Sequence, residues 1–293
     1  MTFGIDISEY QKSLDFSKLR GEGVEFVMLR SSWTGYGSAR NIVKDEAFES
    51  FYNKAKTLGL PVGAYHYSCA DSYQEGQREA RFMWENCIKG RVFEYPIVLD
   101  MENEKWQGNC SRGRLTDAFF GFFDFMSEKG CYVTLYASTY WLEQKFDTER
   151  IKAIDKWAAD WGHNPPDVYN LGLWQFGGET NLIRGTRIAG MTIDQNYAFR
   201  DYPEIMHRRG FNGCTTIATE PPQTTTPTKS HETLQKGSEG LSVRVWQAVV
   251  GVEVDGIFGA DTERAVKDWQ RSNGLVPDGI IGVNSWSKLL QIL

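Results

Sequence analysis

Acidic residues follow a short apolar run at alternate positions in the segment YPIVLDMENEKW, residues 95–106. Residues 97–99 are typical of a buried strand, and Asp100, Glu102 and Glu104 come after them. Side chains two residues apart on a strand point the same way, with Cα atoms about 6.5 to 7 Å apart, so Asp100 and Glu102 face the same space. Repulsion between two carboxylates at the end of a buried strand is expected to raise the pKa of one of them.

A carboxyl group that keeps its proton near neutral pH can protonate the leaving oxygen of a glycosidic bond, while a second carboxylate stabilises the positive charge that develops on the sugar. Asp100 and Glu102 therefore indicate glycosidic-bond hydrolysis. Two other interpretations stay open for this pair. Paired acids at a strand end also serve as helix caps or solvated loop residues. A group of acids can also bind a metal ion, although the lack of nearby histidines disfavours a metal site.

Eight short apolar or alternating segments predict the strands that position these acids: FGIDIS, VEFVMLRSS, PVGAYHYS, YPIVLDME, YVTLYAS, DKWAAD, LGLWQF and TIDQNYAF. Helical spacing of apolar residues follows several early strands, in DEAFESFYNKAKTLG, SYQEGQREARFMWENCIKG and LTDAFFGFFDFMSEKG. This alternation predicts an α/β fold with a parallel sheet closed into an irregular TIM-like (β/α) barrel. The gaps between the later strands are too short for full helices, so we expect hairpin-like connections in the last third.

In a parallel barrel the carboxyl ends of the strands open onto the ligand face, so polar residues there mark a site. Asp6 and Asp194 occupy this position on the first and last strands, which are neighbours in a closed barrel. We expect both to join Asp100 and Glu102. His66 should face away from this mouth as a structural residue. The residues expected to contact a sugar are Tyr65, Tyr67, Tyr136, Trp161, Gln175 and, because it follows the acids, Trp106.

Composition excludes several classes of function. The chain of 293 residues has a net charge of -6 and no dense basic stripe, which argues against a nucleic-acid partner. No apolar run approaches the roughly 20 residues of a membrane span. Five widely spaced cysteines without a CxxC pair favour reduced thiols over disulfides or a zinc site. The N-terminal segment MTFGIDISEYQ has no signal-peptide pattern, so we expect synthesis in the cytoplasm and no general secretory export.

A Thr- and Pro-rich segment divides the chain. We predict a catalytic barrel over residues 1–211, a linker over 212–233 and a small all-α domain over 234–293. The last domain contains a repeat, since WQAVVGVEVDGIFG and WQRSNGLVPDGIIG both have WQ, seven residues, DGI, one residue and Gly. The repeat predicts about three short helices, with Trp246 and Trp269 in their core.

The segments GIDISEYQ, PVGAYHYS, YPIVLDMEN, LYAS, LWQF and MTIDQNYAF, in this order, resemble glycoside hydrolase family 25, the lysozymes of phages, bacteria and some fungi. The C-terminal repeat resembles the three-helix peptidoglycan-binding domain. This resemblance implies a muramidase, which cleaves the β-1,4 bond from N-acetylmuramic acid to N-acetylglucosamine without a cofactor. Glu102 would be the general acid and Asp100 would stabilise the transition state.

The remaining residues have implied roles as well. Asp6 and Asp194 would complete the acidic cluster, and Tyr65, Tyr136 and Gln175 would hold the sugar. The resemblance leaves open whether Asp100 attacks the sugar or orients the substrate's own N-acetyl group.

A wall hydrolase with a wall-binding module and no signal peptide is typical of a phage endolysin, which accumulates in the host cytoplasm until the membrane opens. A bacterial autolysin of the same activity is the second hypothesis. A catalytically inactive wall-binding lectin and a chitinase-like specificity are further alternatives; the intact acids disfavour the lectin, and the second domain disfavours the chitinase.

Overall fold

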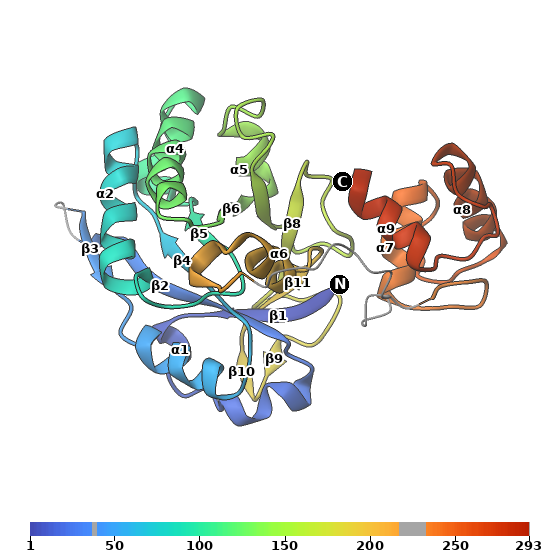
Figure 1. The fold of residues 1–293 in the computed structure, drawn as a ribbon, viewed down its shortest axis with the longest axis horizontal. Coiled ribbons are helices and arrows are strands. Elements are labelled where there is room, and N and C mark those ends of the chain that lie inside the picture. The colour runs from blue at the N-terminus through green and yellow to red at the C-terminus, as the bar shows by residue number, and fades with distance from the viewer. Residues whose placement is uncertain (37–39, 217–232, 293) are drawn as a thin grey trace. The chain divides into compact units, whose positions relative to one another are not determined.

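The computed structural model describes residues 1–36, 40–216 and 233–292 (Figure 1). The chain divides into two compact units, an N-terminal one that begins at Thr2 and a C-terminal one that contains the described residues from 233 onward. Among the described residues, no helix is long and apolar enough to span a membrane.

The N-terminal unit is a closed eight-stranded barrel, in the order β1-β2-β4-β5-β6-β7-β8-β11 and back to β1. Every strand predicted from the sequence is present, and the α/β barrel is confirmed. The strands are β1 (Thr2–Ile7), β2 (Phe26–Tyr36), β4 (Val62–Tyr67), β5 (Ile97–Asp100), β6 (Val133–Ser138), β7 (Asp155–Ala159), β8 (Leu171–Gly177) and β11 (Asp194–Ala198).

The barrel is irregular in its last third. Strand β11 runs antiparallel to both neighbours, β1 and β8, whereas the other neighbouring barrel strands are parallel. The expected hairpin-like connection therefore occurs between β8 and β11. It does not occur between β7 and β8, which stay parallel although only residues 160–170, without a helix, join them. Short pairs not expected from the sequence are β3 (Asn41–Lys44) beside β2, and β9 (Arg187–Ile188) with β10 (Met191–Thr192).

Helices α1 (Phe48–Thr57), α2 (Tyr73–Met83) and α4 (Arg112–Glu128) form where the apolar spacing predicts them. A π-helical turn at Trp84–Ile88 extends α2. Helices α2 and α4 lie side by side outside the strands (Figure 1). They approach closely through Gly76 and Gly121, where an added Cβ would lie 2.0 Å from a backbone oxygen of the other helix. The shorter helices are α3 (Glu104–Gln107), α5 (Thr139–Gln144) and α6 (Tyr202–Arg209).

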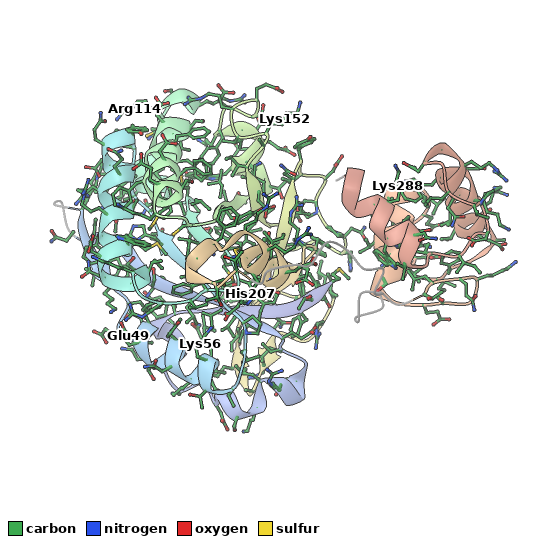
Figure 2. All side chains as sticks on the ribbon, viewed as in Figure 1. Glu49, Lys56, Arg114, Lys152, His207 and Lys288 are labelled. Atoms are coloured by element: carbon green, nitrogen blue, oxygen red, sulfur yellow. The ribbon has the colours of Figure 1, made fainter. Side chains whose placement is uncertain are left out.

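Apolar and aromatic side chains fill the barrel, and charged ones such as Arg114 and Lys152 lie at its periphery (Figure 2). Phe26 and Tyr95 stack inside it with ring centroids 4.1 Å apart. Below this layer, the buried carboxylate of Asp155 accepts hydrogen bonds from Tyr132, Tyr202 and Arg200. Each carboxylate oxygen of Asp155 therefore has a hydrogen-bond partner, which indicates a structural role for these residues.

The described barrel unit extends past the domain boundary predicted at residue 211. The side chain of Asn212 is buried, donates to the carbonyl of Tyr95 at 2.9 Å and accepts from the amide of Tyr132 at 2.8 Å. Cys214 is also buried, against the same core. These residues belong to the barrel because they satisfy its backbone groups. Most of the predicted linker, residues 217–232, lies outside the described residues.

The C-terminal unit contains α7 (Leu241–Val250), α8 (Ala260–Ser272) and α9 (Val283–Ile292). The repeat has a structural cause. The buried Gln247 donates to the carboxylate of Asp255 at 2.7 Å and accepts from the amide of Gly256 at 2.8 Å. In the second copy, Gln270 binds Asp278 and Gly279 in the same way, at 2.9 Å each. Each glutamine thus holds the DG turn that follows its helix.

The tryptophans of the repeat pack inside the C-terminal unit. Trp246 is fully buried, and Trp269 is half-buried with its ring 4.9 Å from that of Trp246. This agrees with the expectation that both contribute to the core.

Candidate active site

A pocket of about 260 Å³ lies at the mouth of the barrel. It contains all four acids that the sequence singled out. Its lining consists of Asp6, Ile7, Ser8, Tyr10, Gln11, Arg30, Tyr65, Tyr67, Asp100, Glu102, Tyr136, Trp157, Gln175 and Asp194.

The strand register explains how the acids meet. Asp100 is the last residue of β5, and its register partners are Tyr67 on β4 and Tyr136 on β6. Asp6 on β1 pairs with Asp194 on β11. Asp194 begins its strand, contrary to the expectation that it ends one. It still reaches the mouth because β11 runs in the opposite direction, so its first residue lies at the carboxyl ends of the parallel strands.

Asp6 is buried and held by two amides. Its Oδ2 accepts from Nδ2 of Asn196 at 2.7 Å and from Nε2 of Gln175 at 3.1 Å. Burial raises the pKa of Asp6 to about 6, and the two hydrogen bonds limit the rise. The pKa of Asp6 is therefore raised less than that of Asp194, which burial and neighbouring charge raise to about 8. The sequence analysis missed Asn196, whose Oδ1 also accepts from the indole of Trp157 at 2.8 Å.

Asp100 is 4% exposed and its Oδ1 has no hydrogen-bond partner among the described residues. Burial, then the charges of Glu102 and Asp6, raise its pKa well above the ordinary value. A buried carboxyl oxygen without a partner is costly unless it is protonated or meets a ligand. Because Asp100 lines the pocket, a bound substrate can supply the missing contact.

Glu102 is reachable from the mouth and makes no hydrogen bond or ion pair within the described part of the chain. Desolvation by the pocket walls and the charge of Asp6 raise its pKa. The Glu102 carboxyl is thus biased toward its protonated form and free to donate. Glu104, the third acid of the segment, begins α3 and does not line the pocket.

Asp194 completes the cluster beside Gly178. Burial, followed by the charges of Asp6, Glu102 and Glu179, raises its pKa to about 8. A Cβ at Gly178 would lie 1.9 Å from Oδ1 of Asp194, so this position requires a glycine while Asp194 keeps its place. The four carboxyls interact closely enough to titrate as a group, and at neutral pH they carry fewer than four negative charges.

Polar and aromatic residues predicted to bind sugar also come together here. The Tyr136 hydroxyl donates to Oε1 of Gln175 at 3.0 Å, and the Trp161 indole donates to the same oxygen at 3.3 Å. Tyr65 and Tyr67 line the pocket, as β4 alternation predicts. Trp161 is 38% exposed and reaches the site through Gln175 without lining the pocket itself.

Alternation on β4 directs His66 away from the pocket, as expected. Its ring is fully buried, with hydrogen bonds to Ser32 at 2.8 Å and Thr34 at 3.0 Å. The equally buried carboxylate of Glu79 lies 3.5 Å from its Nε2.

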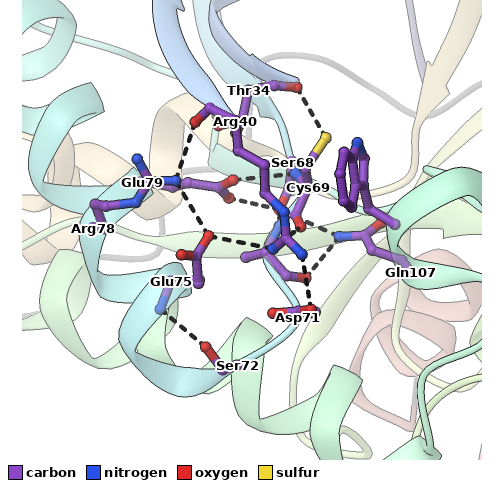
Figure 3. Close-up of polar contacts among 12 residues, drawn as sticks. Thr34, Arg40, Ser68, Cys69, Asp71, Ser72, Glu75, Arg78, Glu79 and Gln107 are labelled. Atoms are coloured by element: carbon purple, nitrogen blue, oxygen red, sulfur yellow. Dashed lines mark hydrogen bonds and ion pairs between the residues drawn. The ribbon is translucent and has the colours of Figure 1, made fainter. Parts of the chain in front are cut away.

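Trp106 is not brought to the pocket. Helix α3 turns it away from the acids, and the guanidinium of Arg40 lies 4.5 Å from its ring centroid. Arg40 in turn forms ion pairs with Asp71 and Glu75 (Figure 3). A role for Trp106 in substrate binding stays a prediction.

Buried polar residues behind the mouth anchor the loop that carries Glu102 (Figure 3). Glu79 on α2 accepts from the Ser68 hydroxyl at 2.6 Å and from the amide of Cys69 at 3.1 Å. Gln107 donates to the carbonyl of Ala70 at 3.0 Å and accepts from the amide of Asn103 at 3.0 Å. The loops that follow β4 and β5 are therefore tied together.

Six further lining residues were not predicted as site residues from the sequence: Ile7, Ser8, Tyr10, Gln11, Arg30 and Trp157. Arg30 lies inside β2, and a charge within the apolar run VEFVMLRSS is the signal that could have revealed it. Tyr10 belongs to the turn that follows β1. Trp157 on β7 packs edge-on to Tyr136 at 4.7 Å. Within the described residues, no group of three or more His, Cys, Asp or Glu side chains is arranged to hold a metal ion.

Two segments of the chain match known protein families. Residues 5–184 match the family described as glycosyl hydrolases family 25. The chain belongs to that family. It is thus a glycoside hydrolase of the lysozyme type, and the matched region contains Asp6, Asp100 and Glu102 but ends before Asp194. Residues 245–289 match a putative peptidoglycan binding domain, which indicates peptidoglycan as the partner of the C-terminal unit.

Individual relatives agree with this family 25 assignment. An autolytic lysozyme of Clostridium acetobutylicum is 26% identical over 270 residues, which cover 91% of this chain and 72% of the relative. An N,O-diacetylmuramidase of Arthroderma benhamiae is 24% identical over 213 residues, which cover 67% of this chain and 86% of the relative. The crystal structure of the CTP1L endolysin has the same fold, with a TM-score of 0.58 at 24% identity, covering 72% of this chain and 70% of that one.

Proposed function

We propose that this family 25 hydrolase is a muramidase that cleaves the β-1,4 bond between N-acetylmuramic acid and N-acetylglucosamine of peptidoglycan. The observation that carries the proposal is the Glu102 carboxyl, whose pKa is raised and which has no hydrogen-bond or ion-pair partner among the described residues, in the same pocket as the buried Asp100. Two relatives that are a lysozyme and a muramidase by name support the choice of bond.

In the proposed reaction Glu102 is the general acid. It donates its proton to the glycosidic oxygen as the bond to the sugar C1 breaks, and the departing sugar leaves as an alcohol. In its ionised form, Asp100 stabilises the positive charge that develops at C1. Its free Oδ1 suits either of two roles, attack on C1 or acceptance of a hydrogen bond from the N–H of the substrate's N-acetyl group. Water completes hydrolysis in both cases.

Asp6 and Asp194 set the electrostatics of the proposed site. The charge of Asp6 contributes to the raised pKa values of Glu102 and Asp100 and so favours a proton on the acid. Gln175 orients Asp6 and is itself fixed by Tyr136 and Trp161. Asp6, Gln175 and Tyr136 line the pocket together, so the sugar would contact them there.

A turbidity assay on purified cell walls tests the proposal against the inactive-lectin alternative. The parent protein should clear a wall suspension, and the Glu102→Gln variant should bind the walls without clearing them. A parent protein that sediments with walls but never lowers turbidity would favour a lectin.

We further propose that the protein acts as a phage endolysin, made in the host cytoplasm and released onto the wall. All five cysteines are free thiols and four of them are buried, which suits a protein that accumulates in a reducing compartment. An autolysin is the second candidate, because the relative from Clostridium acetobutylicum is an autolytic lysozyme. Bacteria that produce the protein internally should lyse only after a permeabilising agent opens their membrane. Lysis without that agent would favour the autolysin.

A further inference from the structure

Tyr10 is the one strongly exposed aromatic residue among those that line the pocket, with 76% of its surface accessible. It lies in the short helical turn Glu9–Gln11, directly after β1. Its hydroxyl has no hydrogen-bond partner within the described part of the chain. An aromatic ring with a free polar tip at the rim of a pocket is suited to bind a ligand that is partly apolar and partly polar.

The turn that carries Tyr10 is rigidly held. Ser8 caps it, and the Ser8 amide donates to the side chain of Gln11 at 2.9 Å. Glu9 accepts from Arg30 at 2.8 Å, and its amide donates to Asp45 at 3.0 Å. These contacts fix the backbone of an exposed residue.

Arg30 also makes a cation–π contact with the ring itself. Its guanidinium binds the buried carboxylate of Asp45 at 2.8 Å and lies 5.1 Å from the ring centroid of Tyr10. The ring is therefore positioned before any ligand arrives, which lowers the entropic cost of binding.

Tyr10 and Trp161 lie on different sides of the barrel mouth. Tyr10 follows β1, and Trp161 follows β7, two strands that are not neighbours. Going around the barrel from β1 to β7, one direction passes Asp100 at the end of β5 and Glu102 just after it, and the other direction passes Asp194 on β11. A sugar chain that runs from Tyr10 to Trp161 therefore passes between the carboxyls.

We propose that Tyr10 stacks on a pyranose ring of the glycan on the β1–β2 side of the mouth, across the acids from Trp161. The apolar C–H face of the sugar packs on the aromatic ring, and the free hydroxyl binds a sugar hydroxyl or acetamido group. This inference rests on the proposed function and adds a binding position that accounts for substrate on both sides of the cleaved bond.

The test compares Tyr10→Ala and Tyr10→Phe with the control Tyr169→Ala. Tyr169 is 64% exposed on the β7–β8 connection and does not line the pocket. On soluble peptidoglycan glycan fragments, Tyr10→Ala should raise KM about tenfold with kcat within about twofold of the parent, as expected for lost stacking. Tyr10→Phe should raise KM much less than Tyr10→Ala, and Tyr169→Ala should match the parent.

Calorimetry with the same fragments and Glu102→Gln as the background separates binding from turnover. Tyr10→Ala should weaken fragment affinity about tenfold in this background. A KM and an affinity equal to those of Tyr169→Ala, in a parent protein that cleaves the fragments, would overturn the role of Tyr10 and leave the proposed function intact. A folded parent that cleaves no glycan would overturn the proposed function instead, while the affinity comparison still decides the role of Tyr10.

Discussion

At the scale of single residues, the site combines acids with unlike environments. Asp6 is fixed by two amides, which limit the rise of its pKa to about 6, while burial and neighbouring charge raise the pKa values of Asp100, Glu102 and Asp194. Environments that separate the pKa values of neighbouring acids are how one site provides both a proton donor and a negative charge.

Removal of the Glu102 proton should abolish most activity and leave the fold intact. Glu102→Gln keeps the size and shape of the side chain but has no proton to release, so the rate should fall by about 10² to 10⁴. Wall-suspension clearing gives the rate, and thermal unfolding gives the stability, which should equal or exceed that of the parent because repulsion among the acids is relieved. A folded Glu102→Gln protein with near-parental rates would exclude Glu102 as the proton donor.

The charge of Asp6 should set the alkaline limit of activity. Asp6 contributes to the raised pKa of Glu102, so Asp6→Asn lowers that pKa, and Glu102 then loses its proton at a lower pH. The alkaline limb of the profile of kcat against pH should therefore move to lower pH. Asp117→Asn, at an exposed position on α4, is the matched control and should leave the limb in place. An unshifted limb in Asp6→Asn would show that Asp6 does not hold the proton on Glu102.

At the scale of elements, the catalytic loop depends on buried polar contacts with its neighbour. Gln107 joins the segment after β5 to Ser68 and Ala70 after β4. Glu79 on α2 accepts a hydrogen bond from Ser68. Burial raises the pKa of Glu79, but His66 and the hydrogen bonds lower it by more, so the pKa of Glu79 is lowered. Helix α2 thereby supports Glu102 without touching the pocket.

Replacement of Gln107 by Met should loosen this support. The variant keeps the side-chain volume but leaves buried backbone groups without partners, at a cost of about 1 to 3 kcal/mol in the free energy of unfolding. We expect a lower kcat together with this loss, as Glu102 becomes less well positioned. Gln74→Met, at an exposed position on α2, is the control for both measurements. Parental kcat and stability in Gln107→Met would mean that the loop holds its shape unaided.

The sequence was informative about the elements for a physical reason. Strand periodicity and the rule that strand ends line the mouth located Asp6, Asp100 and Tyr136, because these depend on one strand each. The direction of β11 could not be read from its own residues, because an antiparallel strand has the same alternation as a parallel one. Asn196 was missed because its role depends on Asp6 on another strand, and Arg30 was missed because its partners, Asp45 and Glu9, lie in other segments of the chain.

Trp106 shows the limit of the sequence signal. It follows the acids in sequence, but a single turn of helix at Glu104–Gln107 places it beside Arg40 and outside the pocket lining, so its role in substrate binding stays a prediction. Nearness in sequence predicts nearness in space along a strand more safely than across a change of secondary structure.

At the scale of the whole molecule, each unit has its own buried core, which predicts that each folds alone. Limited proteolysis in the predicted linker should release a barrel fragment of about 23 kDa that still cleaves soluble glycan. The C-terminal fragment should sediment with cell walls without cleaving them. On intact walls the joined chain should act faster than the barrel fragment, because tethering raises the local concentration of enzyme. Equal rates would remove the targeting role of the C-terminal unit.

The identity of the cleaved bond tests the account most directly. Peptidoglycan digested by the full chain and then reduced can be examined by mass spectrometry for the sugar at each new reducing end. Cleavage between N-acetylmuramic acid and N-acetylglucosamine predicts reduced N-acetylmuramic acid at those ends, and none in a Glu102→Gln digest. Reduced N-acetylglucosamine ends, or released peptides with uncut glycan, would contradict the assignment of muramidase activity.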